Sequence, residues 1–161
     1  MEPRIETLTE KKLVGNRLTM SISNDRTREL WQGFMPRRKK ILNVLSPDLF
    51  CMQLYYNSLD FKDFTPDTRF EKWAAVEVSD FSQVPPDMHC YTLQSGLYAV
   101  FTYKGASSDF GDTFRYIFGV WLPNSEYELD KRAHFEILGD KYKNNDPSSE
   151  EEVWIPIKRK Q

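Results

Sequence analysis

Few residues of this chain are of the types that usually perform chemistry in proteins. It has two histidines, His89 and His134, and two cysteines, Cys51 and Cys90. His89 stands beside Cys90, but no second pair of ligands has the spacing of a metal site, so we expect a surface histidine and no metal or other cofactor. The chain also shows no Ser-His-Asp order, Cys-His pairing or phosphate-binding loop. The options for catalysis are therefore few.

Aromatic residues are more informative than these. Eleven Phe, eight Tyr and four Trp make up 14% of the 161 residues. So many rings must fill a core, line a cavity or do both.

The overall composition restricts the partners of the protein. With 40% hydrophobic and 29% charged residues, the chain has the size and balance of one domain, residues 1–161. Its net charge of -2 argues against nucleic acid as a partner, and the basic run 37–40 is expected to be a solvated helix face. No apolar stretch approaches the roughly 20 residues of a membrane helix, and no signal-peptide pattern begins the chain. We expect a cytoplasmic protein, a monomer or weak dimer, that meets no membrane.

Strands and helices alternate in an order that can be predicted from residue spacing. Residues 3–23 read as a strand or two, broken near residue 10, and residues 49–56 and 71–78 read as further strands. Between them, Asn24 or Asp25 caps a helix whose apolar residues recur at three and four spacing, with Pro36 expected to kink or restart it.

The second half of the chain repeats this order. Residues 88–93 and 97–104 are predicted to form a hairpin, a helix should follow up to Pro123, and residues 134–138 and 153–157 should be strands, with a polar loop at 143–152. The halves correspond in spacing, since Trp31 and Phe34 match Phe118 and Trp121. We therefore predict an α+β fold made of two pseudo-symmetric strand-helix-strand-strand modules, roughly 1–80 and 88–161, whose antiparallel sheets flank a central ligand pocket.

Three segments resemble a known family. Residues 96–105 (GLYAVFTYKG), 121–125 (WLPNS) and 134–138 (HFEIL) are similar in sequence and order to the signature of GyrI-like proteins and of the effector domains of drug-sensing AraC/MerR-type transcription regulators. The resemblance covers nearly the whole chain and implies two strand-helix-strand-strand modules around a pseudo-twofold pocket. No DNA-reading segment accompanies these motifs, so we expect no direct contact with nucleic acid.

The resemblance implies one functional carboxylate, at the position that Glu136 occupies here. In the family this group lies at the floor of a ring-lined cavity and contacts cationic or polar aromatic ligands. A carboxylate partly removed from water gains much from a flat cation that stacks on rings. The alternative is a surface glutamate that pairs with Lys141 or Arg132.

Strand alternation suggests which residues line this pocket. If Phe135 and Ile137 face the helices, Glu136 points the opposite way. The same rule places Trp154 in the pocket from the last strand. In the first half it places there Cys51, Gln53, Tyr55, Trp73 and Glu77. For residues 96–104 it leaves open whether Tyr98, or Phe101 with Tyr103, faces the ligand. Trp31, Phe34, Phe118 and Trp121 have the helical spacing of core residues.

Two functions compete on this basis. The first is a module that binds amphipathic, aromatic or cationic small molecules. The second is a hydrolase that opens cyclopropane-type or other electrophilic genotoxins, with Glu136 moving a proton and a hydroxyl of Tyr55 or Tyr103 polarising the electrophile. A third possibility, a protein inhibitor of gyrase, has no exposed apolar helix or edge in its favour.

Overall fold

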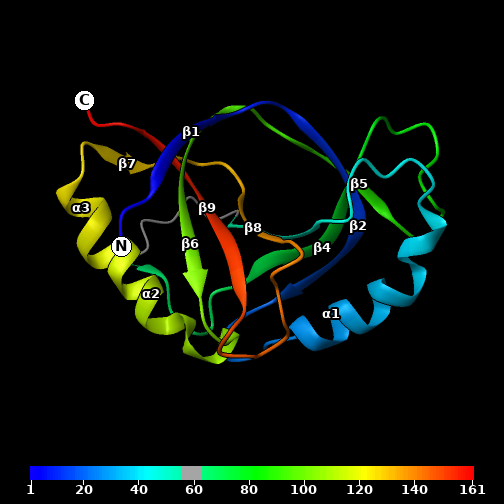
Figure 1. Cartoon of the computed structure of the whole chain (residues 1–161), viewed down its shortest axis with the longest axis horizontal. Helices are drawn as coiled ribbons and strands as arrows, with labels where there is room; N and C mark the ends of the chain where they lie inside the picture. The colour runs from blue at the N-terminus through cyan, green and yellow to red at the C-terminus, as the bar shows by residue number, and fades with distance from the viewer. Residues whose placement is uncertain (56–62) are drawn as a thin grey trace.

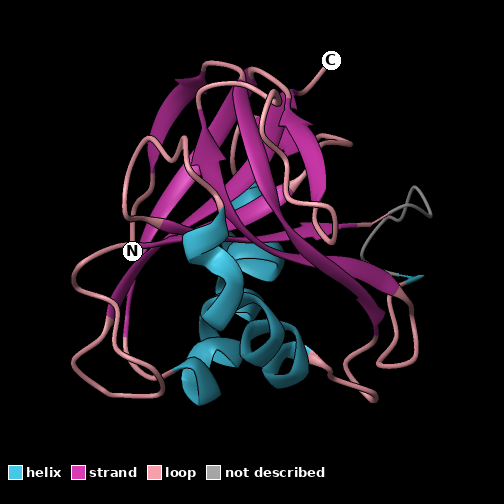
Figure 2. Ribbon diagram, turned by 90° about the vertical axis from the view of Figure 1, so that its right-hand side faces the viewer, coloured by secondary structure: helices cyan, strands magenta, loops and turns pink. Residues whose placement is uncertain are grey.

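One antiparallel sheet forms most of the molecule, and two helical blocks lie on one of its faces (Figure 2). The computed structural model describes residues 1–55 and 63–161; the end of the strand predicted over 49–56 lies outside them. The strands are β1 (Arg4–Leu8), β2 (Lys11–Met20), β3 (Leu49–Leu54), β4 (Phe70–Val78), β5 (His89–Leu93), β6 (Gly96–Lys104), β7 (Tyr127–Leu129), β8 (His134–Leu138) and β9 (Glu150–Arg159).

The two helical blocks differ in regularity. The first consists of α1 (Thr27–Phe34) and the 3₁₀ helix η1 (Met35–Lys40), and Pro36 stands in the first turn of η1, where its missing N–H costs nothing. The second runs from η3 (Ser107–Asp109) through α2 (Phe110–Tyr116) and the π-helical turn η4 (Ile117–Trp121) to α3 (Leu122–Asn124). Both helices were predicted, and Pro123 stands one residue before the end of the second block.

The strand order is β1-β6-β9-β8-β3-β4-β2-β5, with β7 beside β9. The α+β class and the antiparallel pairing are therefore confirmed. The expectation of two separate sheets is wrong, because β3 pairs with β8 and joins the halves edge to edge, with Cys51 opposite Glu136. A continuous ladder satisfies the backbone groups that two sheet edges would leave unpaired.

The predicted hairpin is also wrong. Strand β5 pairs with β2, while β6 pairs with β1 and β9. Leu8 faces Gly96 and Lys11 faces Leu93, so the two-residue links 9–10 and 94–95 run side by side, and each carries the chain from one half of the sheet to the other. Gly96, with φ of 151°, adopts a backbone conformation there that side chains disfavour. These short links make the sheet curl round on itself (Figure 1).

The curl separates the core into three clusters. The cluster on its inner side contains Trp73, Tyr98, Phe135 and Trp154. The other face carries one cluster under each helical block: Leu30 and Phe34 of α1 pack over β2 and β4, and Ile117 of η4 packs over β6 and β9. Two further features of the strands differ from prediction. Strand β7 was not expected, and β9 begins at Glu150, inside the predicted loop 143–152.

No helix in the described part of the chain is long and apolar enough to cross a membrane.

Candidate functional site

Glu136 lies at the centre of the sheet, between the two helical blocks. It faces Cys51 of β3 on one side and Val153 of β9 on the other. Cys51 in turn faces Ala74, which belongs to the cluster under α1, whereas Val153 belongs to the cluster under η4. Because directly opposed residues share a face, Glu136 points to the side that carries the helices. The prediction that Phe135 faces the helices and Glu136 points away from them is wrong.

The carboxylate of Glu136 is held by one side chain of the neighbouring strand. Nε2 of Gln53 donates a hydrogen bond of 3.0 Å to its Oε2 and also approaches the sulfur of the buried Cys51 at 3.6 Å. Burial raises the pKa of Glu136 above its ordinary value, against the opposing effects of Lys72 and of the Gln53 hydrogen bond. Glu136 is half-buried, so part of its surface is open to solvent.

A single lysine, Lys72 of β4, contributes positive charge to this cluster. Its Nζ donates a hydrogen bond of 2.9 Å to Oγ1 of Thr27 at the start of α1, and that hydroxyl donates to Asp25 at 2.5 Å. Burial by itself would lower the pKa of Lys72, but Cys51, Glu136 and the other acidic groups nearby raise it. Lys72 therefore stays charged, although it makes no ion pair within 4.0 Å among the described side chains.

Glu136 also makes no ion pair with the described residues. The two partners that the surface alternative required are engaged elsewhere: Arg132 pairs with Asp130 at 2.8 Å and Lys141 with Glu150 at 3.9 Å. A partly desolvated carboxylate is stabilised by a contacting cation, and the described residues supply none to Glu136.

Aromatic rings from both halves contact His134 and Cys51, which share the face of Glu136. Tyr55, at the end of β3, packs edge-on against His134 with 4.9 Å between ring centroids, and Phe118 of η4 lies 6.2 Å from the same imidazole. On the α1 side Trp31 lies close enough to Cys51 to influence the pKa of its thiol, which burial raises to about 12. Burial raises the pKa of Tyr55 as well, and the charge of Glu136 adds to this effect.

His134 is neutral at physiological pH. Burial, reinforced by the charge of Arg132, lowers its pKa to about 3. Within residues 1–55 and 63–161, no three His, Cys, Asp or Glu side chains gather as metal ligands would.

Three of the predicted pocket residues lie on the opposite face. Trp73 faces Met52 across the β4–β3 pair, and Trp154 faces Phe135 across the β9–β8 pair and stacks on it at 5.2 Å. Glu77 shares the face of Trp73 and pairs with Lys11 at 3.4 Å. Trp73 and Trp154 do lie on the face away from the helices, as predicted, and are core residues inside the curl. The prediction is wrong for β3 and β8, whose Cys51 and Glu136 face the helices, so the tryptophans and Glu136 do not share a face.

Phe101 and Tyr103 share the helix-facing side with Glu136, whereas Tyr98 lies inside the curl. Phe101 faces Val153 and packs edge-on against Trp121, and Tyr103 faces Glu151. The hydroxyl of Tyr103 donates to the carbonyl of Ala106 at 2.5 Å, so this group is already occupied.

Sequence reasoning missed four residues around Glu136. Trp31 and Phe118 have helical core spacing, which hides a second role. Lys72 could have been noticed as the one lysine in an otherwise apolar face of β4, alternating with Ala74. Glu151 was assigned to a loop, although it lies on β9 two residues from Val153 on the same face.

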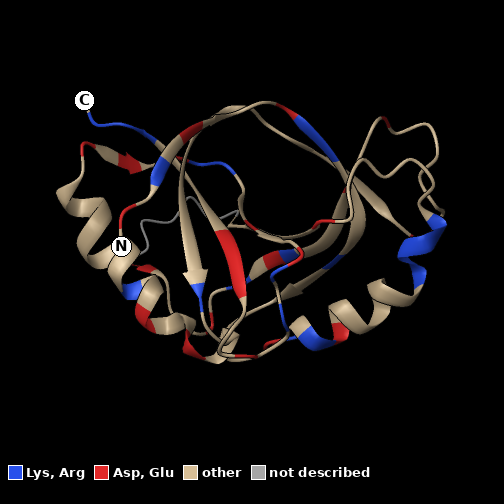
Figure 3. Ribbon diagram, in the orientation of Figure 1, with Lys and Arg blue, Asp and Glu red and all other residues tan. Residues whose placement is uncertain are grey.

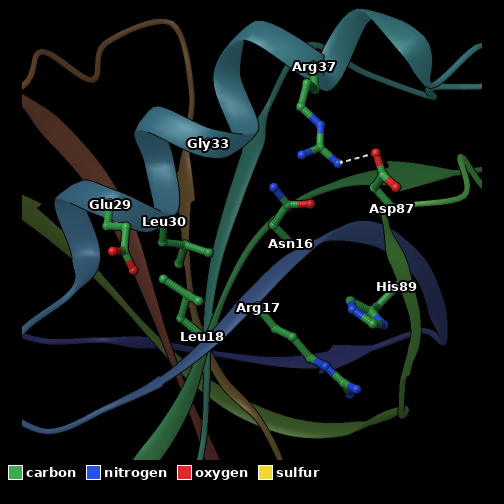
Figure 4. Close-up of a pocket in the computed structure, with 9 residues that line it drawn as sticks. All are labelled: Asn16, Arg17, Leu18, Glu29, Leu30, Gly33, Arg37, Asp87 and His89. Carbon is green, nitrogen blue, oxygen red and sulfur yellow. Dashed lines mark ion pairs between the residues drawn. The ribbon is translucent and has the colours of Figure 1, made fainter.

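A separate groove of about 240 Å³ lies beside α1 (Figure 4). Arg37 and Asp87 form an ion pair of 3.1 Å across it, and Gly33 of α1 leaves room above Asn16. Its lining residues are Asn16, Arg17, Leu18, Glu29, Leu30, Gly33, Arg37, Asp87 and His89. This lining contains no Phe, Tyr or Trp, so the groove is unlike the aromatic pocket that was predicted.

Comparisons with known proteins identify the family of the chain. The family model described as GyrI-like small molecule binding domain matches residues 1–158. The transcriptional regulator BrlR of Pseudomonas aeruginosa is 27% identical over 98% of the chain, and the chain spans 56% of the length of that regulator.

Two solved structures show the same fold. SAV2435 bound to tetraphenylphosphonium is 18% identical, with a TM-score of 0.70, and the match covers 98% of this chain and 94% of that one. The EcmrR C-terminal domain is 13% identical, with a TM-score of 0.73, over 99% and 98% of the respective chains.

Proposed function

Because the chain belongs to the GyrI-like family of small-molecule-binding domains, we propose that it binds an aromatic cation between its two helical blocks, with Glu136 as the counter-ion. The observation that carries the proposal is the position of this carboxylate. It is partly desolvated, points toward the helices and has no ion-pair partner among the described residues. The tetraphenylphosphonium bound by SAV2435, a flat-ringed monocation, is the class of ligand that such a group would take.

The rings near Glu136 support an aromatic ligand. Trp31 of the first block and Phe118 of the second flank the strand pair that carries Cys51 and Glu136. A cation placed between these rings would gain cation–π attraction of about 0.5–2 kcal/mol per ring in addition to the charge pair. Both rings are half-buried and can therefore offer surface to a ligand.

The proposal extends to a pseudo-twofold relation between the halves. The order of strands β2-β4-β3 in one half is matched by β6-β9-β8 in the other. In each half a tryptophan donates its indole N–H to the glutamate two residues earlier, Trp73 to Glu71 at 2.7 Å and Trp154 to Glu152 at 3.1 Å. We thus treat residues 1–161 as one duplicated domain, and a crystal structure whose halves fail to superpose would overturn that.

Titration with tetraphenylphosphonium tests the binding function. Glu136→Gln should weaken binding about tenfold or more, because it removes the charge and keeps the shape. Glu152→Gln is the matched control, since it makes the same charge change on the other face of β9, where Glu152 accepts hydrogen bonds from Trp154 and Arg4. Equal affinity of the wild type and Glu136→Gln would reject the proposal.

The surroundings of the two tyrosines do not favour the hydrolase alternative. The Tyr103 hydroxyl is engaged by Ala106, and burial raises the pKa of Tyr55, which disfavours its ionised form. Incubating a cyclopropane electrophile with substoichiometric protein decides between the two: product beyond one equivalent establishes turnover, whereas a ceiling at one equivalent excludes it.

A further inference from the structure

A second carboxylate lies on the same face as Glu136, on the adjoining strand. Glu136 faces Val153 across the β8–β9 pair, and Glu151 is two residues before Val153, so both side chains point toward the helices. Diagonal neighbours of this kind have Cα atoms about 7–8 Å apart, which long side chains can bridge. Acidic residues at the start of β9 occupy the middle of the molecule, between the two helical blocks (Figure 3).

The groups around Glu151 come from every neighbouring element. Tyr103 of β6 faces it directly, and its charged surroundings include Glu136 of β8 and Lys72 of β4. The charge of Glu151 also contributes to raising the pKa of Cys51 of β3 and of Tyr142, which precedes β9. The set therefore contains two carboxylates and one ammonium group.

The ammonium group does not contact either carboxylate. Its hydrogen bond goes to Thr27, and among the described side chains neither Glu136 nor Glu151 has a cation within 4.0 Å. Two carboxylates that share one distant cation repel each other and leave negative charge to be neutralised. Burial and the charge of Glu136, only partly offset by Lys72, raise the pKa of Glu151 to about 7.

We propose that Glu151 is a second cation-binding carboxylate of the site, which selects aromatic ligands with two positive charges over ligands with one. The inference rests on the proposed function, since it concerns the same site. One cation of the ligand would pair with Glu136 and the other with Glu151. The ring between them would lie under Trp31 and Phe118.

Binding of the second positive charge of the ligand should release a proton from Glu151. Near neutral pH, Glu151 is protonated in part of the population. A ligand cation beside it favours the carboxylate, so the proton passes from the Glu151 carboxyl to the buffer as the ligand binds. Affinity for a dication should accordingly rise with pH up to about 7 and level off above that value.

Two probes that differ by one benzylic trimethylammonium group test the proposal by calorimetry. Benzyltrimethylammonium carries one benzylic cation, and para-xylylenebis(trimethylammonium) carries the same group twice. At pH 8 the wild type should bind the dication about tenfold more tightly. In Glu151→Gln the preference should fall toward the statistical factor of about two, whereas Glu152→Gln should behave as the wild type.

Proton release provides a second readout that requires no variant. Titrations at pH 7 in two buffers of different ionisation enthalpy should show more protons released by the dication than by the monocation. An unchanged preference in folded Glu151→Gln, or equal release with both probes, would overturn the role of Glu151. Binding of neither probe would instead reject the proposed function itself, and this inference with it.

Discussion

Gln53 donates a 3.0 Å hydrogen bond to Glu136 across the β3–β8 strand pair at the centre of the described sheet. The bond crosses from β3 to β8, so each half of the molecule contributes one partner to the central carboxylate. Gln53 is itself buried, and an amide there can satisfy both the carboxylate and the neighbouring thiol. The charge of Glu136 therefore depends on a hydrogen bond that the β3–β8 pairing holds in place.

Gln53→Leu should raise the pKa of Glu136 further. The bond stabilises the charged carboxylate, so its loss favours the protonated form. Carboxyl resonances of glutamate followed by NMR across pH would measure the change, with Glu136→Gln to assign the signal. Gln94→Leu, an exposed amide in the link before β6, is the control. An unaltered titration of Glu136 in Gln53→Leu would contradict the hydrogen bond.

Replacement of Trp31 or Phe118 by Ala should weaken the binding of tetraphenylphosphonium about tenfold. Each ring lies on the helix-facing side beside the Glu136 strand pair, and loss of a stacking partner costs about 1–2 kcal/mol. Trp154→Phe should lower the free energy of unfolding and leave the affinity nearly unchanged, because Trp154 packs against Phe135 inside the curl. If Trp154→Phe lost affinity while the Trp31 and Phe118 variants kept it, the ligand would bind on the inner face of the curl instead.

His134 should make the fold less stable in acid. Its pKa of about 3 in the folded protein is below the value of 6.5 expected when unfolded, so the unfolded chain binds one more proton between these values. Stability from this group is fully present above pH 6.5 and is lost as pH falls toward 3, by up to about 1.4 kcal/mol per pH unit. Urea unfolding at several pH values should show a shallower acid dependence in His134→Gln than in the wild type; identical slopes would count against a buried neutral imidazole.

Gly15→Ala should destabilise the protein by about 1–3 kcal/mol or prevent folding. A Cβ at this position of β2 would lie 1.9 Å from the carbonyl oxygen of Ala74 and 2.7 Å from Cα of Ala75, both backbone atoms of β4. Gly119→Ala in the second helical block is the matched control, since a Cβ there meets nothing within 4 Å. Thermal unfolding of both variants measures the difference, and equal melting temperatures would disprove the close approach of β2 to β4.

Much of the architecture could be read from residue spacing and from the motif resemblance. Apolar periodicity predicted both helices and most strands, and the segment 134–138 pointed to Glu136 as the residue of interest. Alternation also predicted that Cys51 and Gln53 share the face of Glu136, which the register of β3 and β8 confirms. These features depend on local periodicity and hydrogen-bonding preferences, which each segment carries in its own residues.

Only the tertiary structure decided which face of the sheet holds the site. Alternation divides β8 into an apolar set, Phe135 and Ile137, and a set that contains His134 and Glu136. Both faces of the sheet are covered, one by the helices and one by the curl, so nothing local says which set meets the helices. That choice depends on the crossing of the chain at residues 9–10 and 94–95, which curls the sheet and buries Trp73 and Trp154 on its inner side. Lys72, Glu136 and Glu151 share one face because strands distant in sequence pair with each other. Residue spacing along the chain cannot predict that pairing.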